Sequence, residues 1–212
     1  MSIAAHIKQS LALPDFVVKA YLGDLSDEDL MRRPVPNANH IAWQLGHLIS
    51  SEHQLQNMVA PDSMPPLPEG FAEKHAKETA ASDDPAAFCT KDEYLKAMDE
   101  QRAGTLALLD KLSDEDLEKP SPEQIQQFCA TVGAVIAGQS AHWIMHAGQW
   151  VIVRRQLGKE AMFLLLAAAA RITHRVGQSP LPPGRTGFHL VSCTNLNRVA
   201  GAGLSEAKEA PV

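Results

Sequence analysis

The sequence predicts an all-α protein: a four-helix bundle with a long loop over residues 61–85 and a short fifth helix or an irregular tail at the C-terminus. Two observations favour this fold class. No segment alternates apolar and polar residues as a half-buried strand does, and no Asn-Gly or Asp-Gly pair marks a hairpin. Residues that cap helices, and prolines that end them, divide most of the chain into segments of helical length.

The first half of the chain is predicted to form two long helices. One covers about residues 3–22, and it either continues through Pro14 or starts again there, because proline suits the first turn of a helix better than its interior. A short capped turn follows at residues 26–30. Asn39 is expected to cap the second long helix, which covers about residues 41–59.

The second half is predicted to form two more helices after the long loop. Five prolines fall within residues 61–85, and loops of this length are often functional. Thr90 and the glutamate three residues later form a capping box that opens a helix over about residues 91–112. The fourth helix covers about residues 131–157 and ends at Gly158.

An internal repeat supports a bundle made of two related halves. The hexapeptide Leu-Ser-Asp-Glu-Asp-Leu occurs at residues 25–30 and again, without change, at residues 112–117. Each copy follows one long helix and precedes another, so the two helical hairpins can be related by pseudo-symmetry. The alternative explanation is that Ser-Asp-Glu-Asp is a good helix N-terminus that the chain uses twice.

The chain is predicted to contain a bundle, residues 1–165, and a C-terminal extension, residues 166–212. The apolar run at residues 161–170 can form part of a short fifth helix that caps the bundle or meets a second subunit. From about Thr173 onward the sequence shows no apolar periodicity, so we expect a poorly packed tail that contributes little to the core.

Charge and cysteine content narrow the function classes. The net charge is −6 and the pI is about 5.8, whereas a nucleic-acid-binding domain usually has a basic face or a pI above about 9. The longest apolar run, residues 161–170, is far shorter than the roughly 20 residues that span a bilayer. The three cysteines form no CxxC pair, and the N-terminus does not resemble a signal peptide. We expect a cytoplasmic protein that binds a small molecule, and neither nucleic acid nor membrane.

His142 and His146 are the strongest functional signal in the chain. They lie four residues apart and so share one face of the predicted fourth helix. On a helical wheel Gln149 falls on the same face, and Gly138 removes a side chain one turn before His142. An inward face with two imidazoles and an amide is costly unless these groups are satisfied, and a metal ion would satisfy them. The alternative is a pair that faces solvent or forms hydrogen bonds within the protein.

A catalytic site of the zinc type uses three protein ligands, and His47 is the best candidate for the third. It follows Gly46 in the middle of the helix predicted over residues 41–59, roughly opposite the most apolar stripe of that helix. A histidine that fills the core would not lie there. His40 is near the helix N-terminus, where positive charge is disfavoured, and His53 points well away from His47.

Other catalytic motifs are absent from the sequence. There is no GxSxG, Walker loop or GxGxxG, and HExxH is excluded because Trp143 stands where the glutamate would be. No cysteine has neighbours that indicate a low-pKa thiolate.

Two stretches resemble the DinB/YfiT-like superfamily, and the resemblance covers about residues 1–165. They are Asn39-His-Ile-Ala-Trp43-Gln-Leu-Gly-His47, and His142-Trp-Ile-Met-His146-Ala-Gly-Gln149 followed by Arg154-Arg155-Gln-Leu-Gly158-Lys. The resemblance implies a four-helix bundle in which His47, His142 and His146 hold a divalent metal ion. Some members are transferases or isomerases that use a low-molecular-weight thiol, such as bacillithiol or mycothiol, and many have no assigned reaction.

We therefore expect a divalent-metal-binding protein, either a metal-dependent thiol S-transferase in stress or detoxification chemistry or a related hydrolase or isomerase. Three imidazoles suit zinc, nickel or iron alike, and a homodimer is one expected assembly. Gln149 is the candidate catalytic residue, which would orient bound water or substrate; the alternative is a buried amide bonded to the helix backbone. The alternative function is a non-catalytic metal-binding protein with a stress-response or structural role.

Overall fold

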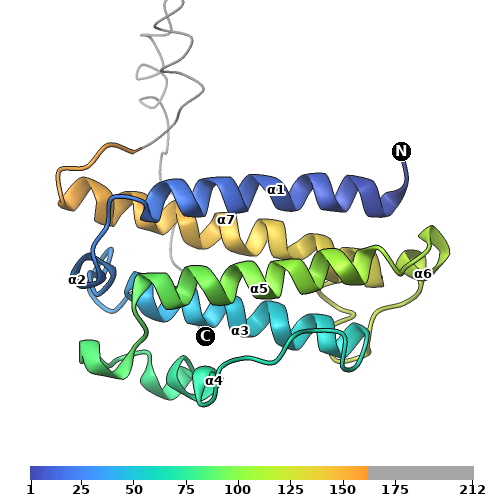
Figure 1. Ribbon diagram of the computed structural model, residues 1–212, viewed down its shortest axis with the longest axis horizontal. Coiled ribbons are helices and arrows are strands. Elements are labelled where there is room, and N and C mark those ends of the chain that lie inside the picture. Colours follow the sequence, from blue (N-terminus) through green and yellow to red (C-terminus); the bar gives the residue numbers. More distant parts are fainter. Residues whose placement is uncertain (162–212) are drawn as a thin grey trace, which may run out of the picture. The chain divides into compact units, whose positions relative to one another are not determined.

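The computed structural model describes residues 1–161, and these residues form an all-α bundle, as predicted. Four long helices are joined by short helical turns (Figure 1). The long helices are α1 (Ile3–Leu22), α3 (Ile41–Val59), α5 (Lys91–Leu109) and α7 (Val132–Gln156). The short ones are α2 (Asp27–Leu30), α4 (Phe71–Lys74), α6 (Asp114–Glu118) and the 3-10 turns η1 (Lys77–Thr79) and η2 (Pro85–Ala87). The described part of the chain contains no strand, only an isolated bridge between Pro120 and Thr131.

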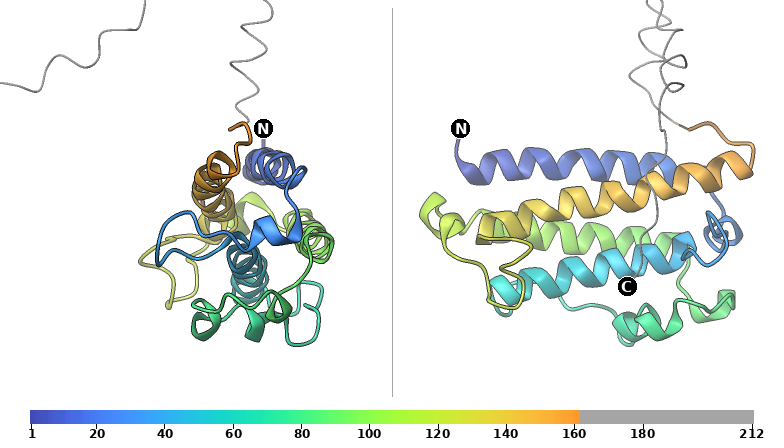
Figure 2. Two further views of the ribbon diagram at one scale, coloured as in Figure 1. Left: turned by 90° about the vertical axis from the view of Figure 1, so that its left-hand side faces the viewer. Right: turned by 180° about the vertical axis from the view of Figure 1, so that it is seen from behind.

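The four long helices surround an interior that contains two clusters of buried apolar residues (Figure 2). Helix α7 packs against α1 and α3, and α5 packs against the other sides of the same two helices. Helices α1 and α7 run in one direction and α3 and α5 in the other, so the segment between α3 and α5 must return along the bundle (Figure 1). That segment contains the predicted long loop, and α4, η1 and η2 lie within it. Its contacts with α3 matter for the site described below.

Helix α1 continues through Pro14 without a second start, which settles the alternative left open by the sequence. Proline has no N–H to donate to the carbonyl oxygen of Ser10, four residues earlier. In the structure the Ser140 hydroxyl of α7 donates to that oxygen, at 2.9 Å. The neighbouring helix therefore replaces the hydrogen bond that Pro14 removes.

Helix α3 begins one residue later than its predicted cap implies, and the prediction that Asn39 caps it is wrong. The N-cap is His40, whose ring Nδ1 accepts a hydrogen bond from the backbone N–H of Trp43 at 3.0 Å. The other ring nitrogen, Nε2, donates to the carbonyl oxygen of Ser82 at 3.1 Å. The ring can cap the helix because the loop accepts its second nitrogen, a contact that local sequence does not reveal.

The two copies of Leu-Ser-Asp-Glu-Asp-Leu form equivalent structures at opposite ends of the bundle. Each serine makes a capping box with the second aspartate of its copy, and these boxes open α2 and α6. The first aspartate of each copy reaches further. Asp27 accepts from the backbone N–H of Lys91, the first residue of α5, and Asp114 accepts from that of Ile3, the first residue of α1. Each copy thus bonds to the first residue of a long helix in the same way, which supports a pseudo-symmetric relation between the two helical hairpins. Local helix capping explains only part of the repeat.

The predicted C-terminal extension, residues 166–212, lies outside the described residues, as do the fifth helix and the tail expected there. Helix α5 ends at Leu109, earlier than the predicted residue 112. Within residues 1–161 no helix combines the length and the apolar character needed to cross a membrane.

Candidate metal centre

His47, His142 and His146 meet where α3 and α7 pack against each other. Because the two helices are antiparallel, the middle of α3 faces the middle of α7, and one ring from α3 lies beside two from α7. One ring nitrogen from each histidine can be chosen so that all three lie within 4.8 Å of one another. The ring centroids are 5.1–5.5 Å apart, and all three residues are partly exposed. The structure therefore brings together the three histidines that the sequence singled out.

The three rings are held in the neutral form, which is the form that binds metal ions. Burial lowers the pKa of all three imidazoles, to about 4 for His142 and His146. The proximity of His47 further lowers the pKa of His142, and both other rings lower that of His146. Three imidazoles that discourage one another's protonation form a donor set for a cation.

The ring of His47 is positioned by Trp43, one turn earlier on α3. The two rings stack with their centroids 5.1 Å apart and their planes 6° from parallel. The indole N–H of Trp43 donates to the carbonyl oxygen of Ala76 at 3.0 Å and lies 3.3 Å from the Thr79 hydroxyl oxygen. The returning loop thus holds Trp43, and Trp43 restricts the rotation of His47.

The ring of His146 is positioned by Gln44, a residue that the sequence analysis missed. Its Nδ1 lies 3.0 Å from the side-chain oxygen of Gln44, which also accepts from the indole N–H of Trp150 at 2.9 Å. Gln44 is 1% exposed and lies among apolar residues on the buried side of α3. A polar residue in an apolar stripe needs a partner, and that signal could have identified it.

Gln149, the predicted catalytic residue, lies beside this pair. Its side-chain oxygen accepts from the side-chain nitrogen of Gln44 at 3.3 Å, so its amide bonds to another side chain rather than to the helix backbone. The amide nitrogen of Gln149 has no hydrogen-bond partner within residues 1–161. The catalytic role stays a prediction.

Three other histidines show what a structural imidazole looks like in this protein. Each has both ring nitrogens hydrogen-bonded within the chain. His40 bonds to Trp43 N and Ser82 O, as described above. His53 bonds to Gln101 and Asn57, and the buried His75 bonds to the Phe71 carbonyl and the Tyr94 hydroxyl. The metal-centre candidates differ: within residues 1–161 the rings of His47 and His142 have no hydrogen-bond partner, and His146 has one.

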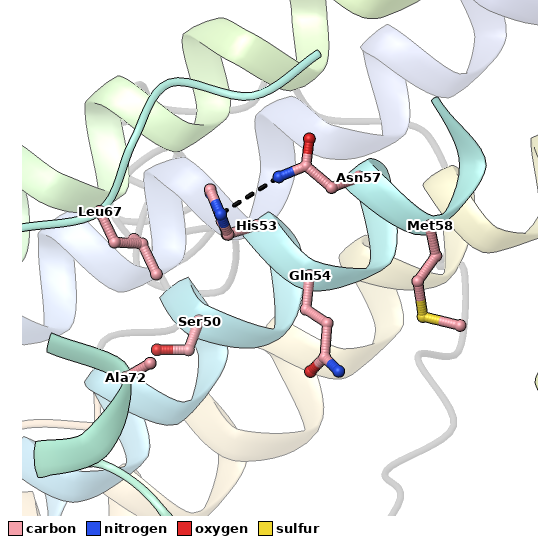
Figure 3. Close-up of a pocket in the computed structure, with 7 residues that line it drawn as sticks. All are labelled: Ser50, His53, Gln54, Asn57, Met58, Leu67 and Ala72. Atoms are coloured by element: carbon pink, nitrogen blue, oxygen red, sulfur yellow. Dashed lines mark hydrogen bonds between the residues drawn. The ribbon is translucent and has the colours of Figure 1, made fainter. Parts of the chain in front are cut away.

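A cavity of about 570 Å³ lies along α3 beyond His47 (Figure 3). Ser50 and Gln54, which line it, follow His47 by about one and two turns on the same side of the helix. Leu67 and Ala72 of the returning segment form another part of its wall, and Figure 3 shows the Ser50 side chain directed towards Ala72. None of the lining residues is Asp, Glu, Lys or Arg. The cavity is lined by His53, and none of the three clustered histidines contributes to its wall.

Comparisons with known proteins agree with the architecture. The model of the DinB superfamily matches residues 17–150, a range that contains all three histidines. The chain is also similar to a solved structure from Enterococcus faecalis, described as the conserved protein of a locus, with 17% identity and a TM-score of 0.54. That similarity covers 75% of this chain and 99% of the other, and at this identity it concerns the fold. A search of curated protein sequences finds no match.

Proposed function

Because this chain belongs to the DinB superfamily, whose membership suggests metal binding, we propose that His47, His142 and His146 bind one divalent cation. The observation that carries the proposal is the donor set itself: three neutral imidazoles from two helices, with ligand atoms within 4.8 Å of one another. No carboxylate or cysteine joins the cluster among the described residues, and three imidazoles suit zinc, nickel or iron. Small rotations of the rings would bring their nitrogens to metal-bonding distance.

We further propose that the protein is a metal-dependent transferase that uses a low-molecular-weight thiol in stress or detoxification chemistry. A divalent cation with three neutral ligands keeps its full charge and lowers the pKa of a thiol or water bound beside them. The cavity, whose wall begins at Ser50 about one turn after His47 on α3, offers space for the body of a substrate. Its neutral lining favours an uncharged, hydrogen-bonding molecule over a strongly anionic one.

The chain's own residues would orient the reactants. We assign to Gln149, whose amide nitrogen has no hydrogen-bond partner within residues 1–161, the role of donating a hydrogen bond to a bound ligand. Trp43 covers one face of the His47 ring and so keeps that face closed to a ligand. In the transfer, the thiol proton passes to solvent, the sulfur forms a bond to an electrophilic carbon, and the leaving group departs with its electron pair.

Elemental analysis of the purified protein tests metal binding. We expect about one zinc, nickel or iron ion per chain, and loss of that ion in the His142→Ala/His146→Ala variant. His6→Ala is the matched control, because His6 is an exposed histidine on α1 outside the cluster. A wild-type protein that holds no more metal than the double variant after incubation with each ion would contradict the proposal.

Cobalt substitution separates the enzyme from the non-catalytic alternative. Addition of the neutral thiol 2-mercaptoethanol to the cobalt-loaded protein should produce the near-ultraviolet charge-transfer band of a thiolate–cobalt bond. One bound cobalt per chain without this band would favour the metal-binding stress-response or structural protein instead. The expected homodimer and the cytoplasmic location stay predictions.

A further inference from the structure

The amide of Gln44 has an orientation that its neighbours determine. The indole nitrogen of Trp150 carries a hydrogen and can only donate, and it lies 2.9 Å from Gln44 Oε1. The amide nitrogen faces two acceptors, the carbonyl oxygen of Asn39 and Oε1 of Gln149. Exchange of the amide oxygen and nitrogen would therefore place a donor against the Trp150 donor and an acceptor against the Asn39 carbonyl. The oxygen of Gln44 must point towards Trp150 and His146.

This orientation determines where the proton of His146 lies. Nδ1 of His146 is 3.0 Å from the same Gln44 oxygen, which can only accept. The neutral ring must then carry its hydrogen on Nδ1, and the lone pair is left on Nε2. In water a neutral histidine favours the opposite arrangement, with the hydrogen on Nε2. Gln44 therefore reverses the intrinsic preference of the ring.

We propose that Gln44 is a positioning residue that holds His146 as the Nδ1–H tautomer and so presents Nε2 as a metal ligand. The inference rests on the proposed metal-binding function. Metal-bound histidines commonly donate their other ring N–H to an acceptor, which fixes the ring orientation and raises its basicity. Gln44 is suited to this role because it is 1% exposed and is held by Trp150, which is completely buried. His146 thus has a preset ligand atom before any cation binds.

The other two histidines are set up differently. His47 is oriented by stacking on Trp43, which fixes the plane of the ring but not the position of its proton. His142 has no hydrogen-bond partner for its ring within residues 1–161 and meets the other two rings edge-on. Only His146 among the three has a tautomer set by the protein in this part of the chain. A change at Gln44 should therefore act through one ligand.

The experiment compares Gln44→Met with Gln44→Glu and Trp150→Phe, each as the full-length chain. Methionine is similar in size to glutamine but offers no strong acceptor, whereas glutamate retains an oxygen for both His146 and Trp150 and, as the protonated acid, can still donate to the carbonyl oxygen of Asn39. Trp150→Phe perturbs the same buried contact but leaves the acceptor for His146, because the carbonyl oxygen of Asn39 still fixes the orientation of the Gln44 amide. The tautomer of His146 is read from long-range ¹H–¹⁵N NMR spectra of the metal-free protein at pH 7.5, and zinc affinity from competition with a chelator.

Wild type should show the Nδ1–H pattern at His146, and Gln44→Met should lose it and bind zinc about 10- to 100-fold more weakly. Gln44→Glu should restore the tautomer and most of the affinity, and Trp150→Phe should keep both near wild type. An Nε2–H signal for His146 in wild type would overturn the proposal, as would a folded Gln44→Met variant with unchanged tautomer and affinity. Equal weakening in Trp150→Phe would assign Gln44 a packing role only.

These outcomes separate the two proposals. Zinc bound by wild type and unaffected by Gln44→Met contradicts the positioning role alone. A wild-type protein with the Nδ1–H tautomer but no zinc affinity contradicts the proposed function, and with it the role of Gln44 towards a metal. The NMR measurement needs no bound metal and therefore reports on the tautomer in either case.

Discussion

Helices α3 and α7 meet at two polar clusters that differ in how their polar atoms are satisfied. At the histidine cluster three neutral rings are partly exposed, and two of them have no hydrogen-bond partner within residues 1–161. About one and a half turns further along α3, the carboxylate of Glu52 is 1% exposed and fully bonded. It accepts from Arg102 at 3.1 Å, from the Thr105 hydroxyl at 2.7 Å and from the indole of Trp143 at 3.0 Å.

The difference distinguishes a structural polar cluster from a binding site. The Glu52 cluster joins three long helices and supplies each carboxylate oxygen with donors from the chain itself. Polar groups that are hydrogen-bonded in this way hold the helices together. Loss of one partner leaves a buried charge unpaired in apolar surroundings, which is destabilising. At the histidine cluster, one ring nitrogen of each residue lies within 4.8 Å of the other two. Residues 1–161 supply no further partner for the cluster, and removal of the cluster should affect binding more than folding.

The largest effect on stability is expected when the Glu52 cluster loses its cation. Arg102→Met removes the guanidinium that pairs with Glu52 and lies 3.5 Å from Asp15, so two carboxylates lose their counter-charge. The free energy of unfolding should fall by about 3–5 kcal/mol, as measured by urea denaturation. Lys96→Met is the control, because the Lys96–Glu100 pair is exposed and contributes at most about 0.5 kcal/mol. A loss below about 1 kcal/mol in Arg102→Met would show that the cluster is not a structural centre.

A smaller effect on stability is expected when the histidine cluster is removed. In His142→Ala/His146→Ala the helix gains two alanines, and the side chains that are lost were only partly buried. The free energy of unfolding of the metal-free protein should fall by about 2 kcal/mol or less, while metal binding is lost. Circular dichroism during urea denaturation and metal content, measured on the same sample, check both parts. Global unfolding of the variant at 25 °C would instead make the cluster structural.

The third prediction concerns the dependence of the free energy of unfolding on pH. The effect should be the smallest of the three at neutral pH and should grow in acid. The pKa values of His75, His142 and His146 are lowered to about 4, chiefly by burial, whereas the unfolded chain protonates them near 6.5. Between these values the unfolded state binds more protons, so the free energy of unfolding falls as the pH falls from about 6.5 towards 4. Above pH 7.5 these groups should make no pH-dependent contribution.

The double alanine variant sharpens this prediction, because it removes two of the three groups and leaves His75 in place. Its free energy of unfolding should fall less steeply than that of wild type between pH 6.5 and 4. The remaining titratable groups are common to both proteins and cancel in the difference. Metal-free samples and urea denaturation at each pH provide the measurement, and parallel curves for the two proteins would contradict the lowered pKa values.

Much of the fold follows from local sequence. The four long helices have the predicted order, and Thr90 forms the predicted capping box at the start of α5. These features depend on residues within one or two turns of one another, so the pattern that encodes them can be read directly from the chain. The same is true of His142 and His146, whose four-residue spacing places them on one face of a helix.

Prediction was less successful where a distant residue supplies a hydrogen bond. Pro14 stays within a helix because Ser140 bonds to the carbonyl that it leaves free, and His40 replaces Asn39 as the cap because Ser82 holds the ring. The role of Gln44 was missed for the same reason: its partners His146 and Trp150 lie more than 100 residues away. Local propensity carries no information about such partners.

The sequence by itself determined the four long helices, the Thr90 capping box and the three candidate ligands, because each depends on helical periodicity or on the chemistry of single residues. Only the tertiary structure decided which ring of the cluster is held by Gln44 and which by Trp43, and which polar residues are satisfied by the chain. The physical reason is that a buried polar group must find its partner in three dimensions. Antiparallel packing of α3 and α7 brings together donors and acceptors that lie far apart in the sequence. The packing of the whole bundle determines how these two helices meet.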